Sequence, residues 1–191
     1  MWHAVLGEAS FYELLEREDE QSAQRARAAG CPHCGGRLHS ARYPRKPRGA
    51  LLELGAGYDR RLSFCCAEDG CRRRTTPPSL RYLGRRAYLA AVVVLATALR
   101  QGVTPLRASK LRELFGVDRR TLMRWRRWWL DTFVQTPLWR ARRALLAVTV
   151  AEQELPAPLL DRFAGTPHER VVAVLRLLAP LTTRSGDIAA L

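Results

Sequence analysis

The sequence predicts a mainly α-helical protein with one small β-structured module in its first half. Two observations predict the helices: an apolar run extends from Ala87 to Leu99, and three later helices share a start signal, a threonine followed by a proline. The β module is indicated by five cysteines that all precede residue 72, with alternating apolar residues among them. With 47% hydrophobic residues, the 191-residue chain has the composition of a globular protein.

The cysteines form two clusters with the spacing of a zinc ribbon. Cys31 and Cys34 are separated by two residues and followed by glycines, and Cys66 and Cys71 form a looser second pair. Four thiolates from two such turns satisfy tetrahedral zinc. We therefore expect a structural Zn²⁺ held by Cys31, Cys34, Cys66 and Cys71. Clustered cysteines also favour metal binding in a reducing compartment over disulfides.

One ligand has a direct competitor, because Cys65 and Cys66 are adjacent. Strand alternation places Cys66 on the same side as Phe64, which favours it over Cys65. His33 and His39 are able to replace a thiolate, but a set of four cysteines leaves no position for them. Reduced, buried cysteines without a metal are the alternative interpretation.

The segments before, between and after the cysteine clusters are expected to have different structures. Residues 8–29 are expected to form a helix capped by Ser10, with the acidic run Glu13–Glu20 as a solvated face. Between the clusters, Tyr43–Gly49 is expected to be an exposed basic loop, either touching phosphates or simply solvated. Residues 75–79 contain threonines and prolines and are expected to form a short, stiff linker.

The charge is strongly basic and concentrated in the middle of the chain. The formal net charge is +14; residues 31–150 contain 25 of the 32 basic residues but only 7 of the 18 acidic ones. Such a distribution is typical of proteins that bind nucleic acid. All basic residues except Lys46 and Lys110 are arginines, which suit phosphate and guanine contacts, although a GC-rich genome produces the same bias.

From residue 85 onward the sequence predicts helices throughout. Residues 85–101 are nearly all apolar in their centre and are expected to form a buried central helix. Thr104, Thr136 and Thr166 are expected N-caps, the last with Glu169 in a capping box. The expected helices that follow are 105–115, 118–134, 137–148, 157–164 and 167–179.

Residues 105–134 have the pattern of a helix-turn-helix, with the turn at Gly116 and Val117 and Asp118 as the second N-cap. In that motif the second helix enters the DNA major groove, and its first residues meet base edges. We expect Arg120 and Arg124 to contact bases, while a solvated helix face is the alternative. The complete set of expected DNA contacts is Arg119, Arg120, Thr121 and Arg124 near the helix start, Arg127, Arg107 and Lys110 at phosphates, and Arg72, Arg73 and Arg74 on the ribbon.

Three segments together resemble a known arrangement: Cys31-Pro32-His33-Cys34, the cluster Cys66…Cys71 with Arg72-Arg73-Arg74, and Gly116–Leu122. They look like the zinc-ribbon and helix-turn-helix front end of bacterial insertion-sequence transposases and resolvase-like proteins. The resemblance covers residues 31–134 and implies recognition of the ends of a mobile element. Those transposases continue into a nuclease domain with metal-binding carboxylates, whereas the acids after residue 134 lie in predicted helices.

The sequence therefore predicts an N-terminal helix (1–30), a zinc ribbon (31–79), a helix-turn-helix bundle (80–134) and C-terminal helices (135–191). The expected function is sequence-specific binding of double-stranded DNA, as a regulator or accessory protein of a mobile element rather than an enzyme. A transposase subunit with catalysis supplied elsewhere, and an RNA- or ribosome-associated zinc protein, are the alternatives. The expected protein partner is a second copy of the chain, because a homodimer fits paired half-sites, or a partner recombinase.

A cytoplasmic, nucleoid-associated location in a bacterium is expected. The first ten residues lack a basic start followed by an apolar run, so no secretory signal is evident. The longest uncharged apolar segment, Ala87–Leu99, has 13 residues and is too short to span a bilayer.

Overall fold

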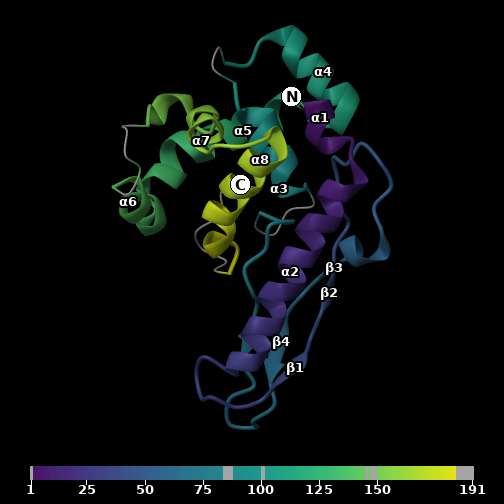
Figure 1. Cartoon of the computed structure of the whole chain (residues 1–191), viewed down its shortest axis with the longest axis vertical. Coiled ribbons are helices and arrows are strands. Elements are labelled where there is room, and N and C mark those ends of the chain that lie inside the picture. Colours follow the sequence, from purple (N-terminus) through teal and green to yellow (C-terminus); the bar gives the residue numbers. More distant parts are fainter. Residues whose placement is uncertain (1, 84–87, 100–101, 145, 147–149, 184–191) are drawn as a thin grey trace.

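The computed structural model describes residues 2–83, 88–99, 102–144, 146 and 150–183. Within this part the protein is mainly helical with a small antiparallel sheet, as the sequence predicts (Figure 1). The main helices are α1 (Trp2–Leu6), α2 (Ala9–Ala29), α3 (Ala90–Thr97), α4 (Pro105–Phe115), α5 (Arg119–Arg127), α6 (Pro137–Arg143), α7 (Ala157–Arg162) and α8 (Pro167–Leu178). The short 3-10 or π-helical turns are η1 (Ala56–Asp59), η2 (Trp128–Thr132), η3 (Phe133–Gln135), η4 (Glu152–Glu154) and η5 (Ala179–Thr183).

The β structure consists of two small antiparallel pairings. The three-stranded sheet has the order β1 (Leu38–Ser40), β4 (Phe64–Cys66), β5 (Arg74–Thr75), and the second sheet pairs β2 (Tyr43–Pro44) with β3 (Arg60–Arg61). In β4, Phe64 and Cys66 are buried while Cys65 between them is half-buried. This is the alternation that the sequence predicts, and it fixes which cysteine faces inward.

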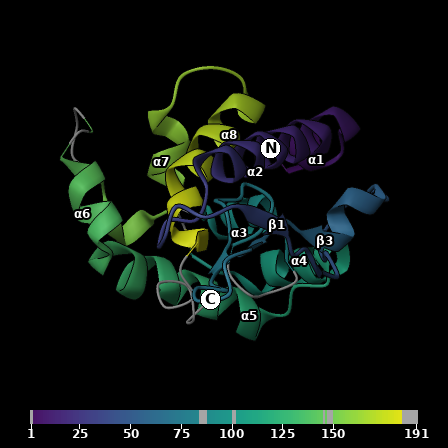
Figure 2. The same cartoon turned by 90° about the horizontal axis from the view of Figure 1, so that it is seen from below.

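Helix α2 runs along the long axis of the molecule and joins its two ends (Figure 1). The other helices gather around its first half, and the cysteine-bearing strands lie against its second half. Figure 2 shows α4 and α5 on the side of α3 opposite to α1 and α2. The protein therefore has a helical body and a β-structured end, here called the cysteine module (residues 31–75), and α2 extends along both.

Two apolar clusters correspond to these ends. The larger cluster centres on α3, in which every residue is buried, and draws on α1, α2, α5, α7 and α8. The smaller one, in the cysteine module, consists of Ala23, Cys31, Leu38, Leu62, Phe64 and Cys66. Because Ala23 belongs to α2, this helix contributes to both clusters.

The three expected threonine caps are confirmed. The side chains of Thr104, Thr136 and Thr166 each accept a hydrogen bond from the backbone N–H three residues later, at 3.1–3.3 Å. Glu169 accepts the N–H of Thr166 at 2.7 Å and completes the capping box. Each cap satisfies a backbone donor that the first helical turn leaves without a partner, so these helices begin where the sequence predicts.

Two predicted helices begin at other residues. The N-terminal helix starts at Ala9 with Glu8 in the cap position, so Ser10 lies inside it and is not the cap, and α1 precedes it. The central helix starts only at Ala90. Leu89 is extended, and its N–H donates to the Arg48 carbonyl at 3.1 Å, so pairing with a distant segment replaces the expected helical turn.

Other predicted helices end differently. The helix expected over 118–134 continues from α5 through the π-helical η2 and the 3-10 turn η3, and α6 ends at Arg143 rather than at 148. Parts of these expectations, at 85–87, 100–101, 145 and 147–148, lie outside the described residues. None of the described helices has both the length and the apolar stretch needed to cross a membrane.

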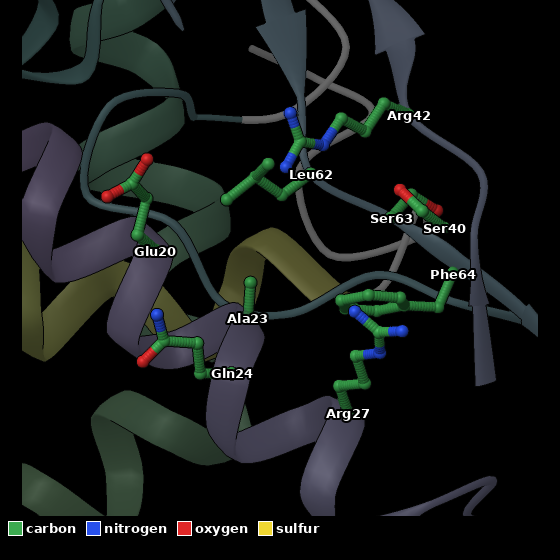
Figure 3. Close-up of a pocket in the computed structure, with 9 residues that line it drawn as sticks. All are labelled: Glu20, Ala23, Gln24, Arg27, Ser40, Arg42, Leu62, Ser63 and Phe64. Carbon is green, nitrogen blue, oxygen red and sulfur yellow. The ribbon is translucent and has the colours of Figure 1, made fainter. Parts of the chain in front are cut away.

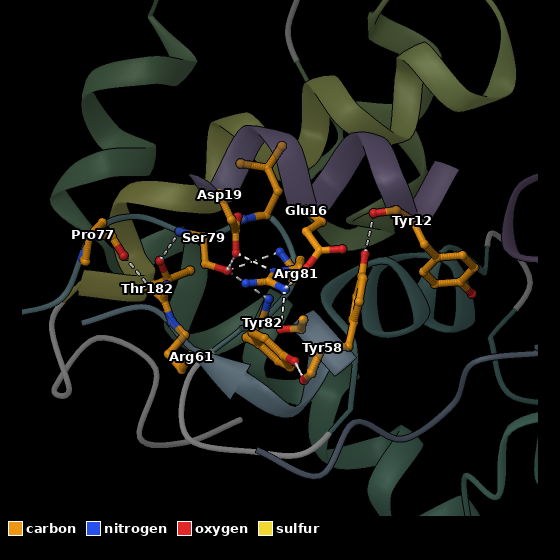
Figure 4. Close-up of polar contacts among 12 residues, drawn as sticks. Tyr12, Glu16, Asp19, Tyr58, Arg61, Pro77, Ser79, Arg81, Tyr82 and Thr182 are labelled. Carbon is orange, nitrogen blue, oxygen red and sulfur yellow. Dashed lines mark hydrogen bonds and ion pairs between the residues drawn. The ribbon is translucent and has the colours of Figure 1, made fainter. Parts of the chain in front are cut away.

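The solvated face expected for the acidic run of α2 is wrong at Asp19, although Glu13 and Glu20 are exposed. Residues 76–79 have no regular structure, as expected for a linker, but Ser79 at its end is buried. Asp19 is 1% exposed, and Ser79 is also 1% exposed. Ser79 Oγ donates to Asp19 Oδ2 at 2.5 Å, so part of the acidic run is buried against the linker (Figure 4). The physical reason is a buried arginine, Arg81, that needs this carboxylate.

Candidate metal centre and basic helix surface

Four cysteine sulfurs converge in the cysteine module. The Sγ atoms of Cys31, Cys34, Cys66 and Cys71 all lie within 4.8 Å of one another. Two of the separations are 3.4 Å (Cys34 to Cys66) and 3.7 Å (Cys31 to Cys71). A tetrahedral ion with metal–sulfur bonds of about 2.3 Å needs sulfurs about 3.8 Å apart. The cluster can therefore hold a metal ion.

The chain folds locally to bring the sulfurs together. In the first turn, Cys31 accepts the N–H of Gly35 through its carbonyl at 2.8 Å and donates its own N–H to Gly36 at 2.8 Å. Gly35 has φ +74°, a conformation that favours glycine. In the second turn, the N–H groups of Cys71 and Arg72 donate to the Glu68 carbonyl at 2.9 and 3.0 Å. Both cysteine pairs therefore lie on tight, hydrogen-bonded turns that fix their direction.

The surroundings of the thiols favour a bound cation. Hydrogen bonding by the backbone N–H of His33, together with that of Cys34, lowers the pKa of the Cys31 thiol to about 7. At Cys66 burial dominates and raises the pKa to about 12. A coordinating metal ion ionises a thiol outright. A bound cation would therefore offset the unfavourable free energy of burying a thiolate at Cys66.

The competing ligands lie outside the cluster. Cys65 is half-buried, and its Sγ donates to the Arg72 carbonyl at 3.3 Å rather than joining the other sulfurs. The His33 Nδ1 atom lies 3.1 Å from Arg73 Nη1, and His39 is exposed on β1. The preference for Cys66 over Cys65, inferred from strand alternation, agrees with this geometry.

Helices α4 and α5 are joined by a tight turn. Gly116 adopts a left-handed conformation (φ +63°, ψ +22°), and its N–H donates to the Arg112 carbonyl at 2.9 Å. Val117 is buried, and Asp118 caps α5 by accepting the N–H of Thr121 at 2.6 Å. A β-carbon is strained at the Gly116 backbone angles, so glycine is the residue that lets the chain reverse here.

The inner face of this helical segment is aromatic. Trp125, Trp128, Trp129 and Phe133 are each at most 1% exposed. Trp129 donates from Nε1 to Thr97 Oγ1 at 2.9 Å, which connects the segment to α3. Trp128 packs against Trp129 and Phe133, so none of the three tryptophans remains on the surface for stacking on a base.

The outer face of α5 carries a row of side chains with a shallow hollow among them. The hollow is lined by Arg119, Arg120, Met123, Arg124 and Arg127. Met123 is 45% exposed although it is apolar, and it is not among the DNA contacts expected from the sequence. Its spacing of three from Arg120 and four from Arg127 places it on the same helical face, and this spacing could have identified it.

Thr121 departs from the expected contact set. Its side chain is 9% exposed and faces the body of the protein, because the first turn of α5 packs inward beside Leu122. Its backbone N–H is occupied by Asp118. Thr121 supports the helix start and does not lie on the exposed arginine face.

The other expected contact residues lie in two places. On α4, Lys110 is exposed and Arg107 half-buried. In the cysteine module the three consecutive arginines after Cys71 are exposed, and each has a contact. Arg72 pairs with Asp69, Arg73 lies near His33, and Arg74 donates to the Ala41 carbonyl at 3.0 Å. These arginines present guanidinium groups at the surface in defined positions.

Comparison of the chain with protein-family models, with curated proteins and with solved structures found no match in any of the three. No family is shown. The resemblance to transposase front ends therefore rests on the quoted residues.

A second hollow, with a volume of about 330 Å³, lies between α2 and the sheet of the cysteine module (Figure 3). Apolar and charged side chains line it together, with Leu62 and Phe64 beside Arg27 and Arg42. Glu20 adds an opposite charge. It is a gap at the junction of α2 with the module, and nothing in the structure defines a ligand for it.

Proposed function

We propose that this protein binds double-stranded DNA through the outer face of α5, with the four-cysteine cluster holding a structural Zn²⁺. The observation that carries the proposal is the row formed by Arg119, Arg120, Arg124 and Arg127 on one face of a helix whose opposite face is fully buried. A helix of ordinary diameter fits the major groove, and arginine is the commonest reader of guanine there.

The turn between α4 and α5 supports a helix-turn-helix assignment. In that motif the first helix braces the second, whose N-terminal residues point into the groove. Here Arg119 and Arg120 are exposed at the start of α5, and Lys110 is exposed on the preceding helix, where a phosphate contact is expected. Met123 adds an apolar group among the arginines, which suits the methyl group of a thymine.

A closed set of four thiolates supports zinc in a structural role. The spacing of the two turns and the tetrahedral separations match sites with four cysteines. Catalytic zinc keeps a coordination position for water or substrate, and a complete set of four protein ligands leaves none. The proposed ion holds the cysteine module in shape and positions Arg72, Arg73 and Arg74 for phosphate contacts.

We further propose that the protein acts as a regulator or accessory factor of a mobile element. This part rests on the resemblance of residues 31–134 to transposase front ends. A homodimer would bring two copies of α5 to paired half-sites, and a partner recombinase would supply the catalysis.

The test is in vitro selection of duplexes that the purified protein retains, followed by affinity measurement over a range of salt concentrations. The double variant Arg120→Ala/Arg124→Ala is expected to lose preference for the selected duplex, by about 1–3 kcal/mol for each lost base contact. The matched control, Arg17→Ala/Arg25→Ala, removes two exposed arginines from α2 and should retain that preference.

Three outcomes would overturn the proposal. The first is a selection that enriches no sequence, and the second is equal binding of the selected duplex by the α5 double variant and the unaltered protein. The third is stronger competition by structured RNA than by any duplex. The last result would favour the RNA-associated alternative. Measuring zinc in the same samples by atomic absorption tests the metal separately.

A further inference from the structure

We propose that the extended segment 44–48 of the cysteine module, with its strand neighbour Arg60, forms a second DNA-backbone contact in addition to the α5 surface. This inference rests on the proposed DNA binding and extends it to residues outside α4, α5 and the arginines that follow Cys71. Lys46, Arg48 and Arg60 are all exposed.

Exposure along the segment alternates residue by residue. Pro44, Lys46 and Arg48 are exposed, whereas Arg45 and Pro47 between them are half-buried. This alternation is typical of an extended chain with one face toward solvent. Arg60 is the direct antiparallel partner of Pro44, and paired residues share a face, so Arg60 joins the same exposed side.

The segment is held firmly at its first end. Arg45 donates its N–H to the Asp59 carbonyl at 2.5 Å, and its guanidinium lies over the rings of Tyr43 (5.2 Å) and Tyr82 (5.8 Å). Arg45 therefore serves the structure, and the cations left for a ligand are its neighbours on the other face.

The second end is held against the body of the protein. Arg48 pairs with Tyr88, and the Arg48 carbonyl accepts the N–H of Leu89 at 3.1 Å. Gly49 follows with φ +88°, and a β-carbon there would lie 3.0 Å from Val92 Cγ1 in α3. Because both ends are fixed, Lys46 and Arg48 bind a ligand with little loss of backbone freedom.

Tyr88 connects this segment to the proposed recognition helix. Its hydroxyl donates to the Gly116 carbonyl at 2.8 Å, and its ring packs edge-on against Trp125 with centroids 5.0 Å apart. Gly116 lies in the turn immediately before α5, only three and four residues from Arg119 and Arg120. Segment 44–48 is thus connected, through Tyr88, to the turn that sets the direction of α5.

The spacing of the cations suits a phosphate backbone. Residues two apart in an extended chain are about 6.6 Å apart, and one DNA strand places a phosphate at each rise of about 3.4 Å along the axis. The spacing of Lys46 and Arg48 therefore suits phosphates along one DNA strand. Phosphate contacts of this kind fix orientation without reading sequence.

The experiment compares Lys46→Ala/Arg48→Ala with Arg17→Ala/Arg25→Ala, which removes the same charge from exposed positions on α2. Affinity for the selected duplex is measured against salt concentration. In Lys46→Ala/Arg48→Ala, here called the segment variant, the plot of log affinity against log salt concentration should become less steep. The magnitude of its slope should fall by about 2, because two phosphate contacts are lost. The control should keep the slope, and the base preference should be unchanged in both.

Phosphate ethylation interference on the same duplex provides a positional readout. The segment variant should lose interference at phosphates flanking the α5 site and retain it elsewhere. An unchanged slope and footprint in the segment variant, or an equal loss in the control, would overturn this inference while leaving the α5 proposal standing. If the unaltered protein binds no duplex, the proposed function itself fails.

Discussion

Arg81 donates from Nε to Asp19 Oδ2 at 2.9 Å, although 62 residues separate them in the chain (Figure 4). Neither side chain is more than 1% exposed. The second oxygen of Asp19 accepts the N–H of Leu80 at 2.6 Å, and Arg81 also donates to the Gly57 carbonyl at 2.8 Å. This buried pair ties α2 to the segment that leads from the cysteine module into the helical body.

The network around this pair extends to the other end of the described chain. Ser79 donates its backbone N–H to Thr182 Oγ1 at 2.9 Å, so η5 is attached to the same point. Tyr58 donates to the Tyr12 carbonyl at 2.6 Å, and Tyr82 donates to the Tyr58 carbonyl. The orientation of the cysteine module relative to α5 therefore depends on polar contacts between segments that are distant in sequence.

The variant Asp19→Asn is expected to destabilise the fold by about 3 kcal/mol, because it leaves a buried guanidinium without its main counter-charge. Glu16, whose oxygen lies 3.6 Å from Arg81 Nη1, limits the loss. Urea unfolding measures the difference. The control Glu20→Gln, at an exposed position on the same helix, should change the free energy of unfolding by less than about 0.5 kcal/mol. Equal effects of the two would refute the role given to the pair.

At the cysteine cluster, Cys34→Ser and Cys65→Ser are expected to behave differently. The first removes a sulfur from the set of four, so bound metal should fall from about one ion per chain to nearly none and the melting temperature should drop. The second alters a thiol outside the set and should keep the metal. Metal analysis and thermal unfolding of the two proteins test which cysteines hold the metal. Loss of metal from the Cys65 variant alone would contradict the assignment of Cys34 as a ligand and Cys65 as a bystander.

The neighbouring tryptophans provide a matched test of packing against hydrogen bonding. Trp129→Phe removes the donor to Thr97 Oγ1 as well as ring volume. Among the described residues, Trp128 Nε1 has no hydrogen-bond partner, so Trp128→Phe removes volume alone. We expect Trp129→Phe to be the more destabilising substitution by about 1 kcal/mol in chemical unfolding. A reversed order would show that the Trp129–Thr97 contact contributes little.

Acid should weaken the start of α5 through Asp118. The Thr121 N–H holds the pKa of Asp118 below its ordinary value, so its cap stabilises the fold above the ordinary value of about 4. That contribution is lost as the pH falls through the lowered folded-state pKa. The variant Asp118→Asn keeps the cap without a charge and should show a flatter loss of stability below about pH 5.

Asp118→Ala should cost about 1 kcal/mol at neutral pH, since the cap itself is removed. Urea unfolding at a series of pH values compares the three proteins. If the unaltered protein and the asparagine variant lose stability in parallel on acidification, the carboxylate of Asp118 is not responsible.

The local features of this protein were determined by its sequence. Threonine–proline pairs specify helix starts because they satisfy the first backbone donors locally, and Gly116 permits the turn before α5 whatever surrounds it. Alternation along Phe64–Cys66 selects Cys66 over Cys65, because side chains of a strand point to opposite faces in turn. Each of these signals acts within a few residues.

The tertiary structure decided what depends on distant partners. Leu89 is extended because Arg48 supplies its hydrogen-bond acceptor, and Asp19 is buried because Arg81 needs a counter-charge. The spacing of four from Leu15 to Asp19 to Ala23 places Asp19 on the buried face of α2, but it does not identify the counter-charge, because Arg81 lies 62 residues away. Burying a charge is favourable only when folding brings its counter-charge to it, so the pairing with Arg81 arises in the folded chain and has no local signature.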